Sequence, residues 1–193
     1  MKQSGKPETA KRKNSKNKGS TFEREIAKQL SKWTGHDFHR TPGSGALHWK
    51  NDARVVSDIV PSQDFPEWKI SVECKCYGKP TYVCDFQSLL NNNATMWRHW
   101  VQCVTDAKRE SLIPMLITKV TGLRRPVFAV MLESDAKKLG LDDAFPSGSF
   151  PHIIVHASSS DVLTDSERRV VIFYLEHLFE NFSIYEFLEK LNV

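Results

Sequence analysis

The chain has 193 residues, of which 40% are hydrophobic and 26% are charged, and it includes 11 Phe and 5 Trp. This composition supplies enough apolar material for a core, so a wholly disordered chain is excluded. No apolar run approaches the roughly 18 to 20 residues that a membrane-spanning helix needs, and the four Cys are too few for a disulfide framework. We therefore expect a soluble intracellular protein with one main domain, no membrane association and no secretory signal.

The net charge of +4 is concentrated at the N-terminus. Residues 1–20 hold seven basic side chains and one acidic side chain, a net +6, which leaves −2 for the remaining 173 residues. We expect residues 1–19 to form a disordered basic tail, because they have almost nothing apolar to bury. A cationic arm can bind DNA by releasing counterions from phosphates, whereas a solubilising tail or a localisation signal is the alternative. The expected DNA-binding residues of the tail are Lys11, Arg12, Lys13, Lys16 and Lys18.

A helix is predicted from Ser20 to Trp33, followed by a Gly-rich polar loop over residues 41–54. Ser20 and Glu23 match a capping box at its start, and Gly35 supplies its end. Apolar side chains recur on one face at helical spacing, namely Phe22, Ile26, Leu30 and Trp33.

The middle of the chain predicts a sheet with one helix. Two β segments, one helix and a β-hairpin follow in order. Their expected ranges are 55–60 and 69–77 for the segments, 95–109 for the helix, and 115–120 with 127–132 for the hairpin. This alternation of helices and strands is typical of a layered α/β fold.

The last third predicts a short strand over residues 153–156 and then two helices. Thr164 with Glu167, and Ser183 with Glu186, have the spacing of capping boxes for these helices. The helices are apolar enough that part of their surface could serve a subunit contact, or both could simply complete the core of the monomer. The apolar residues are Val170, Val171, Phe173, Tyr174, Leu175, Leu178 and Phe179 in the first, and Ile184, Phe187, Leu188 and Leu191 in the second.

The strand over residues 69–77 carries the chemically informative residues. Side chains alternate between the two faces of a strand, so Glu73 and Lys75 project together while Cys74 turns into the core. Asp58, in the strand before it, supplies a second carboxylate, and Mg²⁺ is commonly held by one or two carboxylates with waters and substrate oxygens. A cross-strand salt bridge on a solvated face remains the structural alternative.

Four segments in order resemble the PD-(D/E)xK nuclease superfamily, and within it the archaeal-type and phage-encoded Holliday junction resolvases. They are Lys18-Gly19-Ser20-Thr21-Phe22-Glu23-Arg24-Glu25, Arg40-Thr41-Pro42-Gly43-Ser44-Gly45, Ser57-Asp58 and Val72-Glu73-Cys74-Lys75. The resemblance covers roughly residues 17–132. Two departures are a longer interval between Arg40 and Asp58 and an extension after about residue 140, which has no counterpart.

The resemblance implies a restriction-endonuclease-like α/β core, in which helices flank a central mixed sheet. This nuclease core would span residues 20–135, between the disordered basic tail and a mostly helical C-terminal extension at residues 136–193.

The resemblance also assigns roles to single residues. Glu23, Asp58 and Glu73 would form the acidic cluster around Mg²⁺, for which Mn²⁺ would substitute, with the backbone carbonyl of Cys74 as a further ligand. Lys75 would position or deprotonate the attacking water and stabilise charge on the phosphate. Arg24, Arg40 and Ser44 would contact DNA. The alternatives are a capping role for Glu23 and a solvated face for Arg24.

The expected function is that of a Mg²⁺-dependent, structure-selective DNA endonuclease that resolves four-way junctions by paired nicks as a homodimer. Its expected location is the cytoplasm, at the nucleoid or in a phage-infected cell. The alternatives are another PD-(D/E)xK nuclease with a repair, mismatch-nicking or restriction role, and a non-catalytic DNA-binding protein. A zinc site is not expected, because the spacing of Cys74, Cys76, Cys84 and Cys103 does not match a zinc knuckle.

Overall fold

The computed structural model describes residues 8–41, 57–62, 65–77, 95–120, 126–141, 152–156 and 162–191. The strands are β1 (Phe38–Arg40), β2 (Ile59–Pro61), β3 (Ile70–Tyr77), β4 (Ile113–Val120), β5 (Val127–Leu132), β6 (His152–His156) and β7 (Arg169–Tyr174). The helices are α1 (Glu8–Thr34), α3 (Thr95–Arg109), α4 (Glu133–Lys138), α6 (Leu175–Asn181) and α7 (Ile184–Leu191), with a short 3₁₀ turn, η4, at Ser166–Arg168.

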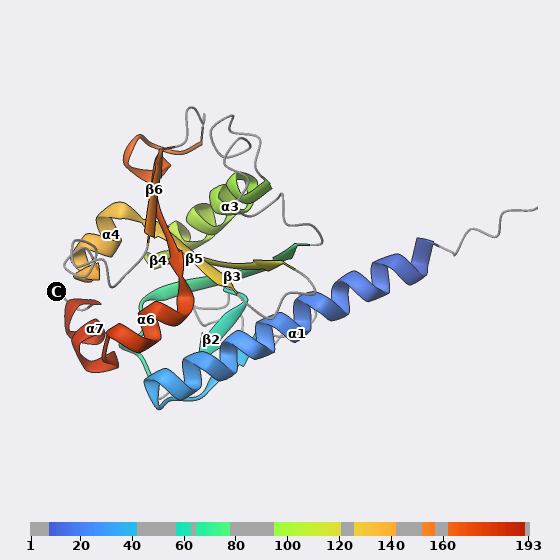
Figure 1. Cartoon of the computed structure of the whole chain (residues 1–193), viewed down its shortest axis with the longest axis horizontal. Coiled ribbons are helices and arrows are strands. Elements are labelled where there is room, and N and C mark those ends of the chain that lie inside the picture. The colour runs from blue at the N-terminus through green and yellow to red at the C-terminus, as the bar shows by residue number, and fades with distance from the viewer. Residues whose placement is uncertain are drawn as a thin grey trace, which may run out of the picture.

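The strands form one seven-stranded sheet in the order β1-β2-β3-β4-β5-β7-β6 (Figure 1). β3 and β4 are parallel and are joined through α3, whereas the other neighbouring strands are antiparallel. The sheet is therefore mixed, and helices cover both of its faces. This arrangement confirms the predicted restriction-endonuclease-like α/β fold class. Among the described helices, none is long and apolar enough to cross a membrane.

Helix α1 is longer than predicted, because it begins at Glu8 and contains 27 residues. The expected disorder of residues 8–19 and the capping box at Ser20 are therefore wrong. Lys, Arg and Ala are good helix formers, and extending a packed helix costs far less than nucleating a new one. In Figure 1 the N-terminal half of α1 projects beyond the sheet.

The predicted end of α1 is confirmed at Gly35. This glycine has φ of +77°, a left-handed conformation that a side chain would disfavour. Its backbone N–H donates a hydrogen bond to the carbonyl of Ser31 at 3.0 Å, which closes the last turn. The chain then reverses into β1 and runs back along the sheet.

The two faces of the sheet carry separate apolar cores. α1 packs on one face through Phe22, Ile26 and Leu30, and α6 and α7 lie on the same side. α3 packs on the opposite face through Met96, Trp97 and Trp100, as its predicted range of 95–109 implied. The indole N–H of Trp100 donates to the carbonyl of Glu167 at 3.1 Å, which ties α3 to η4.

The predicted β-hairpin is confirmed by the antiparallel pairing of β4 with β5. Of the expected pair over 55–60 and 69–77, β3 is confirmed, whereas β2 covers only Ile59–Pro61. Residues 55 and 56 lie outside the described residues, as do residues 42–54 of the expected Gly-rich loop.

The C-terminal third adds two strands to the sheet. The predicted short strand is confirmed as β6, but the helix expected to begin after a cap at Thr164 begins only at Leu175. Residues 169–174 form β7 between β5 and β6, with Val170, Val171, Ile172 and Phe173 buried. A strand covered on both faces has a continuous apolar run, which periodicity alone cannot distinguish from a helix.

The two predicted capping boxes have different outcomes. For α7, the hydroxyl of Ser183 donates to Glu186 Oε2 at 3.0 Å, and the N–H of Glu186 donates back to the hydroxyl at 3.3 Å. This box is confirmed. Glu167 Oε2 accepts from the backbone N–H of Thr164 at 2.8 Å, but this contact closes the 3₁₀ turn η4 and not a full helix.

Candidate active site

Strand β3 places Glu73 and Lys75 on the face of the sheet that α3 covers. Cys74, between them, packs in the opposite core beneath α1. Tyr77, which shares the face of Glu73 and Lys75, has its ring 5.8 Å from that of His99 on α3. Burial, followed by the positive charge of Lys75, lowers the pKa of His99. The predicted alternation of side chains along this strand is therefore confirmed.

Asp58 lies in a bend directly before β2, and not within a strand as expected. Its backbone N–H donates to the carbonyl of Val72 at 2.9 Å, and its carbonyl accepts from the N–H of Thr41 at 2.9 Å. Its carboxylate Oδ2 accepts from the backbone N–H of Cys74 at 2.8 Å. Because this segment pairs with β3, the carboxylate of Asp58 is held at the backbone of Cys74, the residue between Glu73 and Lys75.

The three side chains interact electrostatically. Glu73 and Lys75 form an ion pair in which the side chains are 8% and 24% exposed. Burial and then the negative charge of Asp58 raise the pKa of Glu73 to about 7, although Lys75 opposes this shift. Burial alone would lower the pKa of Lys75, but its ion pair with Glu73 and the charge of Asp58 outweigh that effect and raise it. Lys75 is therefore a cation at neutral pH, which suits charge stabilisation better than proton abstraction.

Glu23 occupies a different position from the other predicted acidic residues. It projects from α1 and forms an ion pair with Arg40 of β1. Its charge acts on Cys74, whose thiol pKa is raised first by burial, then by Asp58 and then by Glu23. The structure therefore brings Asp58, Glu73 and Lys75 together and places Glu23 in a separate ion pair on the α1 side.

The predicted DNA-contacting residues are distributed around α1 and β1. Arg24 and Lys18 are exposed on α1, and Arg40 is 28% exposed while it pairs with Glu23. Ser44 lies outside the described residues. Four further predicted residues lie on α1, and the structure describes their backbone but not their side chains. They are Lys11, Arg12, Lys13 and Lys16.

The acidic residues fit a divalent cation as a pair and not as a larger cluster. Within the described part of the chain, no group of three His, Cys, Asp or Glu side chains could hold a metal ion. Asp58 and Glu73 nevertheless supply hard oxygen ligands, and burial followed by repulsion from Asp58 raises the pKa of Glu73. A bound cation relieves such repulsion, and Mg²⁺ usually retains several waters when only one or two carboxylates bind it.

Sequence reasoning missed a set of hydroxyl groups around this site. The hydroxyl of Thr41 donates to the carbonyl of Ser57 at 2.6 Å, and the hydroxyl of Ser57 donates to that of Ser71 at 2.9 Å. These bonds fix the segment that carries Asp58 against β1 and β3. Ser57, in the bend before β2, and Ser71, in β3, are buried polar residues next to apolar ones, and that anomaly is the signal by which the sequence could have indicated them.

A further missed residue is Thr118, which lies beside Lys75 in the register of β3 with β4. Its side chain is fully buried, and within the described residues its hydroxyl has no hydrogen-bond partner. The neighbouring position of Lys75 and Thr118 depends on a parallel pairing across a helical crossover. Local sequence patterns carry no information about that register.

The sequence predicts core cysteines and no zinc site, and three of the four cysteines lie in the described residues. Cys74 and Cys103 are buried in the two opposite cores, and Cys76 packs against the core beneath α1. They therefore lie apart on the two faces of the sheet, as core cysteines. Cys84 lies outside the described residues.

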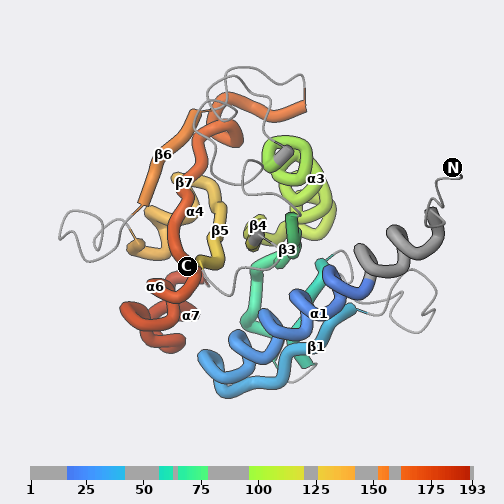
Figure 2. Tube along the Cα trace, turned by 45° about the vertical axis from the view of Figure 1, so that its right-hand side comes forward, coloured from blue at the N-terminus to red at the C-terminus, as the bar shows by residue number. Residues whose placement is uncertain are grey.

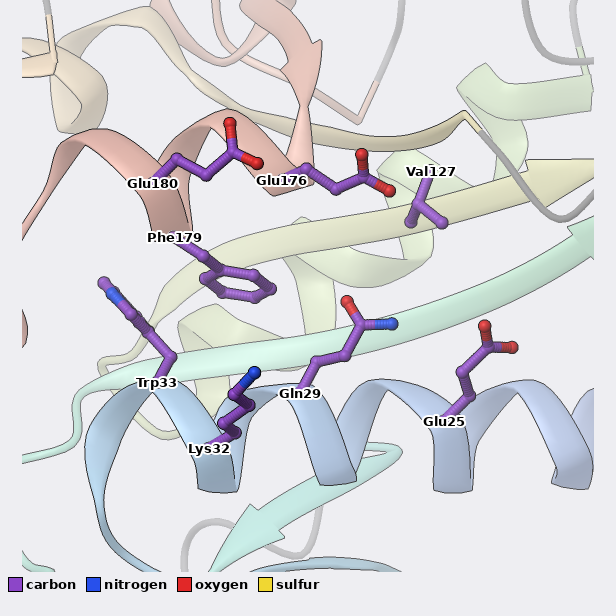
Figure 3. Close-up of a pocket in the computed structure, with 8 residues that line it drawn as sticks. All are labelled: Glu25, Gln29, Lys32, Trp33, Val127, Glu176, Phe179 and Glu180. Carbon is purple, nitrogen blue, oxygen red and sulfur yellow. The ribbon is translucent and has the colours of Figure 1, made fainter.

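A groove of about 580 Å³ lies between α1 and α6, away from Asp58 and Glu73. Figure 3 shows Trp33 and Phe179 at one end of it, with the carboxylates of Glu25, Glu176 and Glu180 along its walls. The three carboxylates outnumber the single ammonium group of Lys32, and this excess of negative charge repels phosphate, so the groove does not favour a DNA backbone. Its full lining consists of Glu25, Gln29, Lys32, Trp33, Val127, Glu176, Phe179 and Glu180.

The mixed sheet, together with Asp58, Glu73 and Lys75 on adjacent segments, defines a nuclease core of the PD-(D/E)xK class. A family model described as "Phage putative PDDEXK endonuclease" matches residues 14–188, and the chain belongs to this family. The match makes the protein an endonuclease that acts on DNA, in a superfamily whose members generally use divalent metals. The matched range also includes β6, β7, α6 and the first part of α7. Neither a search of curated proteins nor a search of solved structures gave a match.

Proposed function

We propose that this endonuclease is Mg²⁺-dependent and structure-selective, and that it resolves four-way DNA junctions by paired nicks as a homodimer. The observation that carries the proposal is the interaction of Asp58 with Glu73 beside the cation of Lys75. Each chain provides one such set, so two coordinated nicks require two chains. The ordered motifs shared with junction resolvases support the choice of a branched substrate.

Asp58 and Glu73 would hold the metal, which when bound supplies an activated water and neutralises charge on the phosphate. The backbone carbonyl of Cys74 is a further proposed ligand. The ammonium group of Lys75 would stabilise the charge that develops on the scissile phosphate and position the attacking water. Glu23, through its ion pair with Arg40, would orient that guanidinium toward the DNA backbone.

The basic half of α1 would bind DNA outside the active site. Residues 8–18 contain five Lys or Arg residues and one Glu, and this helical segment projects beyond the sheet (Figure 1). A helix presents its charges at fixed spacing, so it can neutralise several phosphates at once. We also propose that the protein acts in the cytoplasm, at the nucleoid or in a phage-infected cell.

The test compares cleavage of a synthetic four-way junction with cleavage of linear duplexes that contain the same arm sequences. Both are incubated with Mg²⁺, Mn²⁺, Ca²⁺ or EDTA, and the nicks are mapped on each labelled strand. We expect symmetric nicks in two opposing strands of the junction with Mg²⁺ and Mn²⁺, and at least about tenfold slower cutting of duplex.

A parallel measurement separates metal binding from chemistry. Because a ligand that binds only the folded state stabilises it, Mg²⁺ and Ca²⁺ should raise the melting temperature of the wild type but not that of Asp58→Asn. Efficient cutting of linear duplex would instead indicate a repair or restriction nuclease. Absence of cleavage and of metal-dependent stabilisation would indicate a non-catalytic DNA-binding protein.

A further inference from the structure

Strand β6 ends the sheet within the described part of the chain, on the side away from β1 (Figure 2). It pairs with β7 along one edge. Ile153 and Ile154 of this strand are 43% and 46% exposed, although both are large and apolar. Edge strands are usually protected from further pairing by Lys, Pro or a bulge. β6 consists of His, Ile, Ile, Val and His, with no Lys, Arg, Asp or Glu.

The order of residues in β6 is symmetric about Ile154. If two copies of the strand pair antiparallel about this residue, Ile154 lies opposite itself. Ile153 then lies opposite Val155, and His152 opposite His156. Every aliphatic side chain thus meets an aliphatic side chain, and such cross-strand pairs stabilise a sheet. A register shifted by two residues would place a His opposite Ile154 and lose this match.

The same register continues both cores of the monomer. Ile153 and Val155 pair with Ile172 and Val170 of β7, which belong to the core beneath α3. Ile154 pairs with Val171, which belongs to the core beneath α1. Because directly opposite residues in an antiparallel pair share a face, the new aliphatic contacts would extend each core across the junction of the two sheets.

We propose that β6 is the dimer surface, and that a second copy of this chain pairs with it antiparallel about Ile154. The two-fold axis is then perpendicular to the sheet, so both Glu73–Lys75 faces lie on the same side of the dimer. Nine strand spacings separate the two copies of β3, or roughly 40 Å at the usual spacing of about 4.8 Å. Two strands of five residues each form a small interface, so we expect the dimer to dissociate into monomers at low protein concentration.

Disulfide trapping tests the register directly. Residues opposite each other in an antiparallel pair have Cα atoms about 4.5 to 5.5 Å apart, which a disulfide can bridge. Ile154→Cys should therefore form a covalent dimer under mild oxidation. Ile153→Cys is the matched control: it is equally exposed, but its copy in the partner lies diagonally at about 7 to 8 Å. The unmodified chain, with its four native Cys, gives the background.

We expect at least tenfold more covalent dimer from Ile154→Cys than from Ile153→Cys. Equal trapping of the two variants, or none above background, would overturn the proposal. Sedimentation provides a second measurement: the wild type should change from monomer to dimer with concentration, and Ile154→Lys should raise the dissociation constant at least tenfold. Tyr185→Lys, at a residue of α7 that is 82% exposed, should leave it unchanged. A wild type that stays monomeric at the highest soluble concentration would also overturn the proposal.

The use of this dimer for paired nicks rests on the proposed function, whereas the trapping and sedimentation measurements need neither DNA nor metal. If Ile154→Lys still nicks single strands of a junction but no longer makes paired nicks, both proposals are supported. If trapping succeeds and no DNA is cut, the proposed function fails while the dimer surface stands.

Discussion

At the scale of single residues, the site combines two carboxylates and one ammonium group in a partly buried position. Burial and the charge of Asp58 raise the pKa of Glu73 to about 7, so its ionised form is costly without a compensating cation. The neighbouring Lys75 compensates in part through its ion pair. A group whose pKa is perturbed by burial together with a specific charged neighbour is typical of functional sites.

Removing either carboxylate should abolish cleavage while DNA binding persists. We expect Asp58→Asn and Glu73→Gln each to lower the cleavage rate by at least about 100-fold, because a missing metal ligand removes charge stabilisation in the transition state. Affinity for DNA should be unchanged or higher, since less negative charge faces the phosphates. Single-turnover cleavage and a gel-shift titration measure the two effects.

The matched control for these variants is Asp106→Asn on α3. This substitution also removes one negative charge that raises the pKa of Glu73. The side chain of Asp106, however, forms an ion pair with Arg109 on the surface of the helix. Cleavage by Asp106→Asn should stay within about threefold of the wild type. Near-normal cleavage by Asp58→Asn or Glu73→Gln would contradict the assignment of the site.

A second residue-scale prediction concerns stability at low pH. Hydrogen bonds from Arg169 and then Lys137 lower the pKa of Glu133 to about 2. A lowered pKa in the folded state means that this stabilisation is complete above the ordinary pKa of about 4.5 and is lost as the pH falls toward 2. Both partners are half exposed, so we expect Glu133→Gln to cost about 1–2 kcal/mol at neutral pH and almost nothing near pH 2.

Urea unfolding of wild type and Glu133→Gln between pH 2 and 7 measures this difference. Glu189→Gln, at an exposed residue of α7, is the control and should give a constant, small difference across the series. A penalty for Glu133→Gln that does not decrease with falling pH would show that the ion pairs with Arg169 and Lys137 do not stabilise the fold.

At the scale of elements, α1 joins two parts with different roles. From Phe22 to Trp33 it presents an apolar face to the sheet, and the indole N–H of Trp33 donates to the carbonyl of Phe182 at 3.0 Å. Before residue 19 it has no comparable apolar face and is rich in Lys and Arg. The packed half holds the helix in place, so the basic half is presented as a continuous extension of it and not as a flexible tail.

Deletion of residues 1–18 should weaken DNA binding and its salt dependence without affecting chemistry. It removes seven basic residues and one acidic residue. The slope of log K against log[salt] should fall by about 0.9 for each phosphate that the shortened protein no longer neutralises, while cleavage at saturating DNA is retained. Binding titrations at several salt concentrations measure the slope.

A full-length variant with Gln at Lys11, Arg12, Lys13, Lys16 and Lys18 serves as the matched control, because it removes charge but keeps the length of the helix. Both variants should show the shallower slope. If neither changes it, the basic half of α1 does not contact DNA.

At the scale of the whole molecule, the C-terminal helices complete the core of the monomer. Phe187 is fully buried and its ring lies 5.1 Å from that of Trp33, whereas Tyr185 on the same helix is 82% exposed. The subunit contact considered for Phe187 from the sequence is therefore not available at that residue. The sheet edge at β6 is the more exposed apolar surface.

Phe187→Ala should destabilise the monomer and not merely change its association. Truncation of a buried aromatic ring costs about 3–5 kcal/mol, whereas Tyr185→Ala should cost less than about 0.5 kcal/mol. Urea unfolding at a single low protein concentration measures both. A small cost for Phe187→Ala would show that α7 is dispensable for the core.

The sequence by itself determined the local features of this protein. The alternation of polar and apolar residues along β3 identified Glu73 and Lys75 as neighbours on one face, and helical periodicity identified α3 and the packed half of α1. The spacing of Ser183 and Glu186 located the start of α7. Each of these features depends on contacts within a few residues, and short-range patterns record such contacts directly.

Only the tertiary structure decided the features that depend on distant partners. Residues 169–174 form a strand because β5 and β6 cover its two edges and helices cover both faces, which no local pattern specifies. Glu23 forms an ion pair with Arg40 because β1 returns along α1, a contact that joins two residues 17 positions apart in the sequence. Likewise, Thr118 lies beside Lys75 only because β3 and β4 pair in parallel in this register. Helix α3 separates the two strands in the sequence, and the sheet brings them together.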